Sequence, residues 1–428
     1  MFRTTPAERR RLGSLSRTEL ADYQLARLNA LCDTILPHNA FYAAKLKGIS
    51  RPLPTLDALA EFPYTLKDEL LELPSGALAA NLTYPLERYV RFHQTSGTRG
   101  RPLVVLDTAD DWQWWMNIWQ YVFDAAGLAA GDRVLMAFSF GPFVGFWSAF
   151  DAVIDRGCLT LPGGGMSTLG RLELMRTAGV AVLFCTPSYA LHLAEVAGQH
   201  AIDLPGVGVR KIVVAGEPGG STPAIRTRIE AAWGAELFDH AGASEIGPWG
   251  APAGAGRGLQ VVESEFIAEF RSLATGEAAG EGELAELVLT CLGRPGCPML
   301  RYRTGDLVRP VWNHDLPSRF VLLEGGVLGR VDDMMIVRGV NVFPSSIEQI
   351  VRSFPEIVEY RLTVRKVAEM DELELEIEDH LERPERVADE LRTRLNLRVE
   401  VRCAALGSLP RYEGKGRRFV DLRKDRGT

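Results

Sequence analysis

The strongest constraint on the fold is the alternation of short apolar runs with helical patterns between about residues 133 and 215. Short apolar runs bounded by turn residues are typical of buried strands, and the stretches between them have the pattern of helices or loops. Strands that alternate with helices favour a largely parallel sheet. The sequence therefore predicts an α/β fold, with the strands in RVLMAFSF, CLTLPGG, AVLFCTPS and KIVVAGEP.

A helix rich in aromatic residues is predicted just before this region, in the segment DWQWWMNIWQYVFDAAG. Trp115, Ile118, Trp119 and Val122 recur there at helical spacing, which indicates one apolar face. A buried helix is the interpretation we favour. A wall of a ligand pocket and a contact between subunits stay open as alternatives.

The last hundred or so residues have a different pattern and predict a small second unit. In PSSIEQIVRSF, Ser345 is a predicted N-cap with Glu348 three residues later, followed by an apolar face. ELELEIE has the alternation of a strand that is wet on one side, a helix is predicted near ERVADELRTRL, and a strand near RVEVRC. We place the boundary near Gly329, which gives domains 1–329 and 330–428.

Composition and charge exclude several classes of protein. With 428 residues and 46% hydrophobic residues the chain can bury a sizeable core in more than one unit. The 48 basic and 55 acidic residues give a net charge of −7 without a long block of one sign, so nucleic acid is not an expected partner. No stretch reads as a secretory signal or a membrane span, and the six cysteines form no regular framework. A cytoplasmic protein that does not act at a membrane is the expectation.

The most informative segment is TSGTRGRP, residues 95–102, which lies between two predicted strands. Small hydroxyl residues and glycines in a turn let backbone N–H groups and hydroxyls approach a polyphosphate. An ordinary turn is the alternative for an isolated stretch of this composition. A Walker-type loop is excluded because the GK[ST] ending is missing.

Further motifs follow this loop in a fixed order along the chain. They are AGEPGG at 215–220, FDHAGASEIG at 238–247, YRTGDL at 302–307, GRVDDMMIVRGVNVFPSSIE at 329–348 and EGKGRR at 413–418. The series resembles that of the adenylate-forming superfamily, and the wording RGVNVFPSSIE is most similar to the phenylacetate-CoA ligase branch. The resemblance implies a large N-terminal domain that binds AMP and the acid, and a small mobile C-terminal α/β lid domain with a hinge and a catalytic lysine.

The resemblance assigns the nucleotide site residue by residue. The phosphate-binding loop would be Thr95, Ser96, Gly97, Thr98 and Arg99. Glu245 would hold Mg²⁺ on the phosphates, and a carboxylate suits a hard cation. Asp306 would take the ribose hydroxyls, because a carboxylate accepts two hydrogen bonds. The remaining nucleotide-binding residues implied are Gly216, Glu217, Pro218, Asp239, His240, Ala241, Gly242, Ser244 and Arg330.

Catalysis and the exchange of substrates are assigned to the C-terminal segments and to parts of the same loops. Lys415 resembles the catalytic lysine, whose charge neutralises the carboxylate and the α-phosphate as they approach. Glu245, Thr98 and Arg330 are the other implied catalytic residues. Asp332 corresponds to the hinge. The path of the CoA thiol would pass Arg338, Gly339 and Val340.

The acid pocket is expected where predicted strands end, since open α/β sheets bind ligands there. Its predicted residues are Phe138, Phe143, Tyr189, Ala215 and Gly242. Aromatic walls would suit a flat acid, whereas aromatic residues that fill ordinary core remain the alternative.

Three positions depart from the family pattern. Arg99 and Arg101 stand where Thr and Lys are usual, and both keep positive charge near the pyrophosphate. Ala241 stands where many members have a tyrosine that stacks on adenine, and the neighbouring His240 is expected to substitute in part.

The implied reaction is ATP-dependent activation of an aryl or arylacetic acid to an acyl-AMP, followed by transfer to CoA. The cofactors and partners are ATP or AMP, Mg²⁺, CoA and a small carboxylic acid, and a homodimer is a further expectation. Two alternatives stay open. One is transfer to an acyl-carrier protein or an amine, and the other is a nucleotide-binding module with reduced catalysis.

Overall fold

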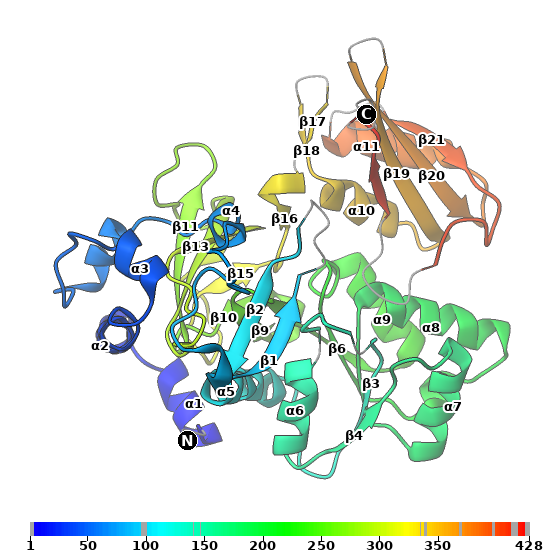
Figure 1. The fold of residues 1–428 in the computed structure, drawn as a ribbon. Coiled ribbons are helices and arrows are strands. Elements are labelled where there is room, and N and C mark those ends of the chain that lie inside the picture. The colour runs from blue at the N-terminus through cyan, green and yellow to red at the C-terminus, as the bar shows by residue number, and fades with distance from the viewer. Residues whose placement is uncertain are drawn as a thin grey trace.

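The protein is described by a computed structural model of residues 4–95, 101–139, 141–145, 147–333, 335–337, 340–367, 370–395, 399–411 and 418–423. Figure 1 shows a larger body, formed by the N-terminal part of the chain, and a smaller body that lies above helices α8 and α9. We call them the large unit, which ends with β16 (Gly329–Arg330), and the small unit, which begins with β17 (Met335–Val337).

A five-stranded parallel sheet of order β4-β3-β5-β6-β7 lies in the large unit. Successive strand residues point to opposite faces, so Leu135 packs with one set of helices and Met136 with the other. The predicted α/β fold and its four strands are confirmed. The four predicted strands are β3 (Arg133–Met136), β4 (Leu159–Pro162), β5 (Val182–Cys185) and β6 (Lys211–Val214), and β7 (Glu236–Asp239) is a fifth strand that was not predicted. The helices around this sheet are α5 (Ala109–Ala125), α6 (Trp147–Asp155), α7 (Thr168–Ala178), α8 (Pro187–Gln199) and α9 (Pro223–Trp233).

Helix α5 is the predicted aromatic helix, and it is buried. Thr108 caps its N-terminus in a reciprocal capping box with Asp111. Trp115, Ile118 and Trp119 are each at most 3% exposed. The aromatic residues therefore fill the core of the large unit, as the favoured interpretation predicted.

Antiparallel sheets continue the large unit beyond β7. Figure 1 shows them beside the parallel sheet, between it and the N-terminal helices. The hairpin is β1 (Tyr89–Gln94) with β2 (Val104–Thr108). One sheet contains β8 (Ala241–Ala243), β9 (Gly247–Ala253), β10 (Gly258–Val261), β14 (Pro310–Val311) and β15 (Leu322–Glu324). The other contains β11 (Phe266–Ser272), β12 (Ala285–Cys291), β13 (Tyr302–Val308) and β16. The N-terminal helices are α1 (Pro6–Gly13), α2 (Arg17–Ile35), α3 (Ala40–Lys45) and α4 (Lys67–Leu71).

The small unit is the predicted α/β unit with its own core. Its sheet has the order β21-β20-β19-β22, and Leu375 and Ile377 of β20 are fully buried, while glutamates alternate with them. The elements are β17, β18 (Val340–Val342), α10 (Pro344–Arg352), β19 (Ile357–Val367), β20 (Met370–Asp379), α11 (Pro384–Leu395), β21 (Glu400–Cys403) and β22 (Phe419–Asp421).

The prediction that Ser345 caps helix α10 is wrong. The N-cap is Phe343, and Pro344 occupies the first helical turn without a side-chain cap. Proline suits that position because its missing N–H would have no partner inside the helix. Ser345 lies within the first turn and donates its hydroxyl to the carbonyl oxygen of Leu328, 2.6 Å away.

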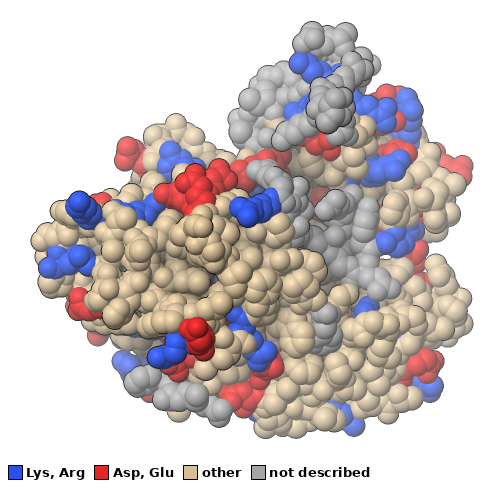
Figure 2. Space-filling view, in the orientation of Figure 1, with Lys and Arg blue, Asp and Glu red and all other residues tan. Residues whose placement is uncertain are grey.

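The surface carries mixed charges. On the face in Figure 2, lysine and arginine side chains lie close to aspartate and glutamate side chains, and much of the visible surface is uncharged. Among the described residues, no helix combines the length and the apolar character needed to cross a membrane.

Candidate active site

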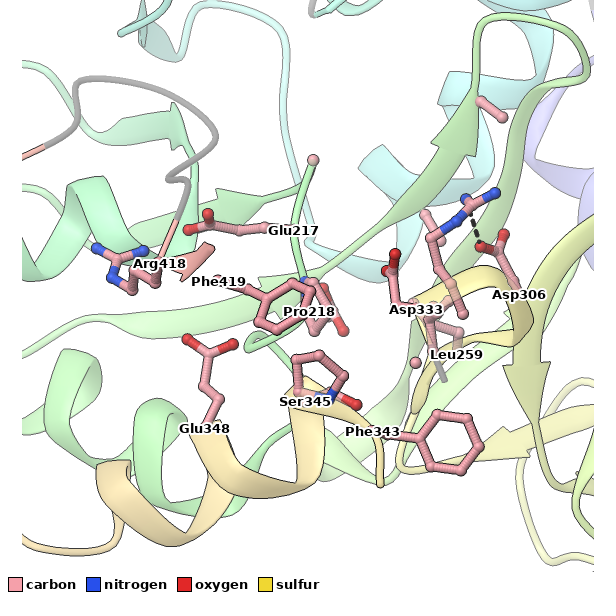
Figure 3. A pocket seen from close by; sticks show the side chains of 18 of the residues that line it. Glu217, Pro218, Leu259, Asp306, Asp333, Phe343, Ser345, Glu348, Arg418 and Phe419 are labelled. Atoms are coloured by element: carbon pink, nitrogen blue, oxygen red, sulfur yellow. Dashed lines mark hydrogen bonds and ion pairs between the residues drawn. The ribbon is translucent and has the colours of Figure 1, made fainter. Parts of the chain in front are cut away.

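A cavity of about 270 Å³ lies between the large and the small unit (Figure 3). Its walls come from segments far apart in the sequence. They follow the carboxyl ends of β6 and β7, where open α/β sheets bind ligands, and add β13, β16 and the small unit. The lining residues are Gly216, Glu217, Pro218, Asp239, His240, Ala241, Gly242, Ala243, Trp249, Leu259, Asp306, Val327, Gly329, Arg330, Asp333, Phe343, Pro344, Ser345, Glu348, Tyr360, Leu362, Arg418 and Phe419.

All predicted nucleotide-binding residues except Ser244 line this single cavity. Ser244 lies in the turn between β8 and β9, half-buried. Gly216 has a φ of 93°, a conformation that side chains disfavour, so the backbone turns sharply after β6. Glu217 accepts a hydrogen bond from the backbone N–H of Ser188, 2.8 Å away, and this contact fixes the turn to α8.

Hydrogen bonds to Ser221 and Gly250 hold Asp239 and His240 in the cavity wall. Asp239 Oδ2 accepts the hydroxyl of Ser221 at 2.5 Å, and burial raises the pKa of Asp239 to about 6. His240 Nδ1 lies 2.7 Å from the carbonyl oxygen of Gly250, so this nitrogen carries the proton. Burial lowers the pKa of His240 to about 4, which keeps the ring neutral near pH 7.

The ring of His240 packs against Trp119, with 4.1 Å between the ring centroids. His240 is only 5% exposed. Little ring surface is therefore left for stacking on a base, in contrast to the expectation that His240 substitutes for the tyrosine absent at Ala241.

Asp306 and Arg330 are paired across strands β13 and β16. Arg330 Nη1 lies 3.0 Å from Asp306 Oδ1, and Nη2 donates to the carbonyl oxygen of Thr304. A Cβ atom at Gly305 would lie 3.1 Å from Arg330 Nη2, and Gly305 also has a positive φ of 75°. The glycine of the RTGD motif thus allows the arginine to lie over the strand.

Glu245 lies outside the cavity wall, in a buried position next to Lys67. Lys67 Nζ is 2.9 Å from Glu245 Oε1, and the hydroxyl of Tyr302 donates to the same oxygen at 3.4 Å. The side chain of Glu245 is 8% exposed, whereas that of Lys67 is 44% exposed. The carboxylate therefore already faces a cation in this structure.

A buried arginine that the sequence analysis did not identify holds the Glu245 segment in place. Arg294 Nη1 donates to the backbone carbonyl oxygen of Glu245 at 2.7 Å, and Arg294 Nε donates to Asp107 Oδ1 at 2.7 Å. Both Arg294 and Asp107 are completely buried. Asp107 lies on β2, the strand that follows the phosphate-loop segment, so one guanidinium joins the two parts of the site. An arginine inside GRPGC gives no sequence signal for this role.

Thr95 closes the base of the predicted phosphate loop. Its backbone N–H donates to the carbonyl oxygen of Leu103, and the N–H of Leu103 donates to Thr95 Oγ1 at 3.0 Å. Several predicted functional residues lie outside the described residues, namely Ser96, Gly97, Thr98, Arg99, Arg338, Gly339 and Lys415. Asp332 lies in the short 3-10 turn Val331–Asp333, and Val340 lies on β18.

Of the predicted acid-pocket residues, Phe138 and Phe143 lie on the aromatic loop after β3, and the others lie elsewhere. Phe138 is half-buried and Phe143 is 47% exposed. The carbonyl oxygen of Pro142 accepts the N–H of Gln94 at 2.8 Å, so this loop lies beside the strand that leads to Thr95. Gly242 is exposed in the cavity between the two units, whereas Ala215 is only 9% exposed.

The prediction that Tyr189 lines the acid pocket is wrong. Its side chain is 0% exposed, and its hydroxyl lies between Arg171 Nη1 and Thr168 Oγ1 at 2.5 and 3.2 Å. A side chain without accessible surface cannot line a pocket, so Tyr189 belongs to the core below α8.

The small unit contributes cavity residues that the sequence analysis did not assign to the site. Figure 3 shows Glu217 of the large unit facing Glu348 and Arg418 of the small unit, with Phe343 at the other end. Burial raises the pKa of Glu348. The sequence analysis interpreted the segment with Ser345 and Glu348 as a helix start. It therefore did not place these two residues in the cavity wall.

Comparisons with known proteins show which proteins this chain is similar to. The family model for the AMP-binding enzyme C-terminal domain matches residues 339–423. A phenylacetate-coenzyme A ligase of Pseudomonas putida is 34% identical over 393 residues, covering 87% of this chain and 86% of that protein. A phenylacetate-coenzyme A ligase of Thermus thermophilus is 31% identical over 96% of this chain and 99% of that protein.

Solved structures of one relative also distinguish two arrangements. The 2-hydroxyisobutyryl-CoA ligase in its postadenylation state, with R3-HIB-AMP bound, matches with a TM-score of 0.91 at 26% identity, covering 98% of this chain and 94% of that chain. The same ligase in its thioesterification state, with 2-HIB-AMP and CoA, matches with a TM-score of 0.73 at 27% identity and the same coverage. The arrangement of the two units described above is thus more similar to that in the postadenylation structure. The chain belongs to the phenylacetate-CoA ligase family of adenylate-forming enzymes and is an AMP-forming acid–CoA ligase, which uses ATP to activate a carboxylic acid and forms its CoA thioester.

Proposed function

We propose that this enzyme activates an arylacetic or aryl acid, with the nucleotide held in the cavity between the two units. The observation that carries the proposal is the convergence of the 216–218 turn, the 239–242 segment, Asp306 and Arg330 on one cavity. These segments are far apart in the sequence, and an accidental series of motifs would not meet in one place.

In the proposed complex the adenine lies against the backbone of residues 216–218 and 241–242. Gly216, Ala241 and Gly242 carry small side chains or none, so a flat base can approach the main chain at these positions. Asp306 accepts the ribose hydroxyls, and Arg330, which already pairs with Asp306, lies beside the ribose and the phosphate. The segment 95–99 would enclose the outer phosphates.

The residues present fit a Mg²⁺ ion that arrives with ATP. Among the described residues no group of three potential metal ligands occurs, so the protein offers no complete cage. Mg²⁺ commonly takes one or two carboxylates and completes its shell with phosphate oxygens and water. Glu245 would be that carboxylate, and the bound ion would neutralise phosphate charge.

The acid is proposed to lie beside the aromatic loop after β3. Phe138 and Phe143 stand on this loop, and the Pro142 to Gln94 hydrogen bond places it next to the start of the phosphate loop. Aromatic side chains offer flat apolar surface to an aromatic ring. The curated relatives named above are phenylacetate-CoA ligases, which favours an arylacetic acid over the 2-hydroxyisobutyrate of the structural relative.

The chemistry requires no protein nucleophile. A carboxylate oxygen of the acid attacks the α-phosphorus of ATP, and the bond to pyrophosphate breaks to leave acyl-AMP. The CoA sulfur then attacks the acyl carbon, AMP leaves with the electron pair of the broken bond, and the thiol proton is released. Positioning and neutralisation of charge are therefore the tasks of the chain. Lys415 is proposed to neutralise the approaching anions in the first half.

Between the halves the small unit is proposed to turn about Asp332, which lies between β16 and β17. Residues 338–340 would then approach the path of the CoA thiol. CoA is the acceptor in this family. Transfer to a carrier protein or an amine stays an alternative, and the homodimer stays a prediction.

Pyrophosphate release across a panel of acids tests the proposal. The panel contains phenylacetate, benzoate, 2-hydroxyisobutyrate and a fatty acid, each with and without CoA. We expect the fastest release with phenylacetate or benzoate and thioester only when CoA is present. A clear preference for 2-hydroxyisobutyrate or the fatty acid would contradict the proposed substrate class.

A further inference from the structure

The guanidinium of Arg411 lies between two carboxylates, one from each unit. Arg411 Nη1 and Nη2 contact Glu378 on β20 at 3.1 and 2.7 Å. On the other side, Nε and Nη2 contact Glu195 on α8 at 3.2 and 3.1 Å. Arg411 therefore joins the small unit to the large unit through paired hydrogen bonds, a geometry that suits a planar guanidinium.

Several hydrogen bonds fix the contact between Arg411 and Glu378 within the small unit. Glu378 is completely buried, and it also accepts the backbone N–H groups of Gly407 and Leu409 at 3.0 and 2.7 Å. Arg411 Nη1 donates in addition to the carbonyl oxygen of Leu409. These bonds fix the orientation of Arg411 without any help from the large unit.

The contact across the units depends on the side chain of Glu195. Glu195 Oε2 also lies 3.4 Å from His192 Nδ1, one turn earlier on α8. Hydrogen bonding to His192 and the Arg411 guanidinium lower the pKa of Glu195 to about 2, so the carboxylate is charged throughout the working pH range. Side-chain exposures of 27% for Glu195 and 20% for Arg411 show that water reaches the pair only in part.

The sequence position of Arg411 gives this contact a consequence for the reaction. Lys415, to which the adenylation step is assigned, lies between Arg411 and Arg418 in the sequence. Arg418 is itself fixed to Glu359, with Nε 2.6 Å from Oε1 and Nη2 2.9 Å from Oε2. The residues on both sides of the 412–417 segment are thus held by ion pairs, and the Arg411 pair reaches the large unit through Glu195.

The contact belongs to one arrangement of the two units. The chain matches the postadenylation structure of the 2-hydroxyisobutyryl-CoA ligase much better than its thioesterification structure, although the relative is the same protein. A placement of the small unit that moves β20 away from α8 would break the bonds between Arg411 and Glu195.

We propose that Glu195 and Arg411 are positioning residues for the acid-activating half of the reaction. By bridging Glu378 and Glu195, Arg411 holds the small unit against α8 in the arrangement in which acyl-AMP forms. Neither side chain needs to touch the substrate. The inference rests on the proposed function, and in particular on the assignment of Lys415 to the first half-reaction.

Substitutions of Glu195 test the pair because they leave the buried bond between Arg411 and Glu378 in place. Glu195→Gln removes the charge, and Glu195→Lys places a like charge beside Arg411. Acid-dependent exchange of pyrophosphate into ATP reports the first half-reaction. Thioester formation from a supplied synthetic acyl-AMP and CoA reports the second.

We expect Glu195→Gln to slow the exchange by about two- to fivefold, the size of the effect of losing a partly exposed ion pair. Glu195→Lys is expected to slow it further, and Glu195→Asp, which keeps the charge, to retain more activity than Glu195→Gln. Thioester formation from acyl-AMP should stay unchanged or rise in all three variants. Glu173→Gln, which breaks the exposed pair with Arg176 on α7, is the matched control and should affect neither half.

The inference is overturned if the exchange rate of Glu195→Lys equals that of the unaltered enzyme, or if both half-reactions fall by the same factor. Equal loss would indicate a general structural role, which thermal unfolding of the variants would also reveal. A failure of the proposed function looks different, because the unaltered enzyme would then show no acid-dependent exchange at all.

Discussion

Lys67 and Glu245 form an ion pair at 2.9 Å, although they are 178 positions apart in the sequence. The pair places a lysine ammonium group on the carboxylate that we propose for Mg²⁺. Lys67 is 44% exposed, so it can leave the carboxylate when another cation arrives.

Replacing Lys67 should therefore change how the enzyme responds to Mg²⁺. In Lys67→Ala the competing ammonium group is gone, and we expect the Mg²⁺ concentration for half-maximal activity to fall by about two- to fivefold, in keeping with a partly exposed pair. Titration of activity with Mg²⁺ at saturating ATP measures this. Substitution of the exposed Lys47 is the control, and a higher requirement for Mg²⁺ in Lys67→Ala would contradict the interpretation.

Loss of Asp306 should weaken nucleotide binding. Asp306→Ala removes the carboxylate proposed to accept the ribose hydroxyls and leaves Arg330 without this partner. Hydrogen bonds to charged groups contribute about 1.5 to 3 kcal/mol, which corresponds to a roughly 10- to 100-fold loss of affinity. Calorimetric titration with AMP gives the value directly. An unchanged affinity would remove Asp306 from the proposed nucleotide site.

The two half-reactions should respond differently to the loss of Lys415. Without its charge, the carboxylate and the α-phosphate repel each other, and we expect Lys415→Ala to slow acyl-AMP formation by about 10²- to 10³-fold. Thioester formation from supplied acyl-AMP should continue at nearly the normal rate. Equal loss in both assays would show that Lys415 is not specific to the first half.

Arg294 should be needed for stability as well as for the site. Arg294→Leu leaves Asp107 buried without its cation, and removing one partner of a buried pair typically costs about 3 to 5 kcal/mol. Urea unfolding, followed by tryptophan fluorescence, measures the change. Arg176→Leu, which breaks an exposed pair, should change the free energy of unfolding by less than ~1 kcal/mol. Similar values for the two variants would rule out the buried network as a source of stability.

His240 should make the stability depend on pH in a defined window. Burial lowers the pKa of His240 to about 4 from an ordinary value of 6.5, so the unfolded chain binds a proton that the folded chain does not. The stabilising contribution is present above pH 6.5 and is lost as the pH falls toward 4, up to about 3 kcal/mol.

Urea midpoints of the unaltered protein and of His240→Gln between pH 4 and 7 test this. The dependence on pH should be shallower in the variant. His200→Gln, an exposed position, should retain the full dependence. Identical curves for all three proteins would mean that His240 does not titrate in this way.

How much of this molecule can be predicted from its sequence depends on the distance over which an interaction acts. The strands β3 to β6, the buried helix α5 and the alternating strand β20 follow from periodicity, because neighbouring residues alone decide which face of an element is apolar. Among these elements, the prediction for the start of α10 was wrong, because Pro344 rather than Ser345 determines how the helix begins.

Nine of the 23 residues that line the cavity were predictable because they belong to motifs, each with its own local turn. The side chains that support them were not. Arg294 meets Asp107 across 187 positions, and Arg411 meets Glu195 across 216 positions, so no pattern along the chain connects these pairs.

Tyr189 also shows that a local sequence pattern does not predict long-range packing. It follows the carboxyl end of β5, where a pocket residue is expected, yet its ring turns into the core beneath α8. The fold class, the order of the motifs and the motif residues that line the cavity all follow from the sequence alone. Which charges pair, which aromatic ring is buried and how the small unit completes the cavity depend on the tertiary structure, because burial and long-range contacts exist only once distant segments have packed together.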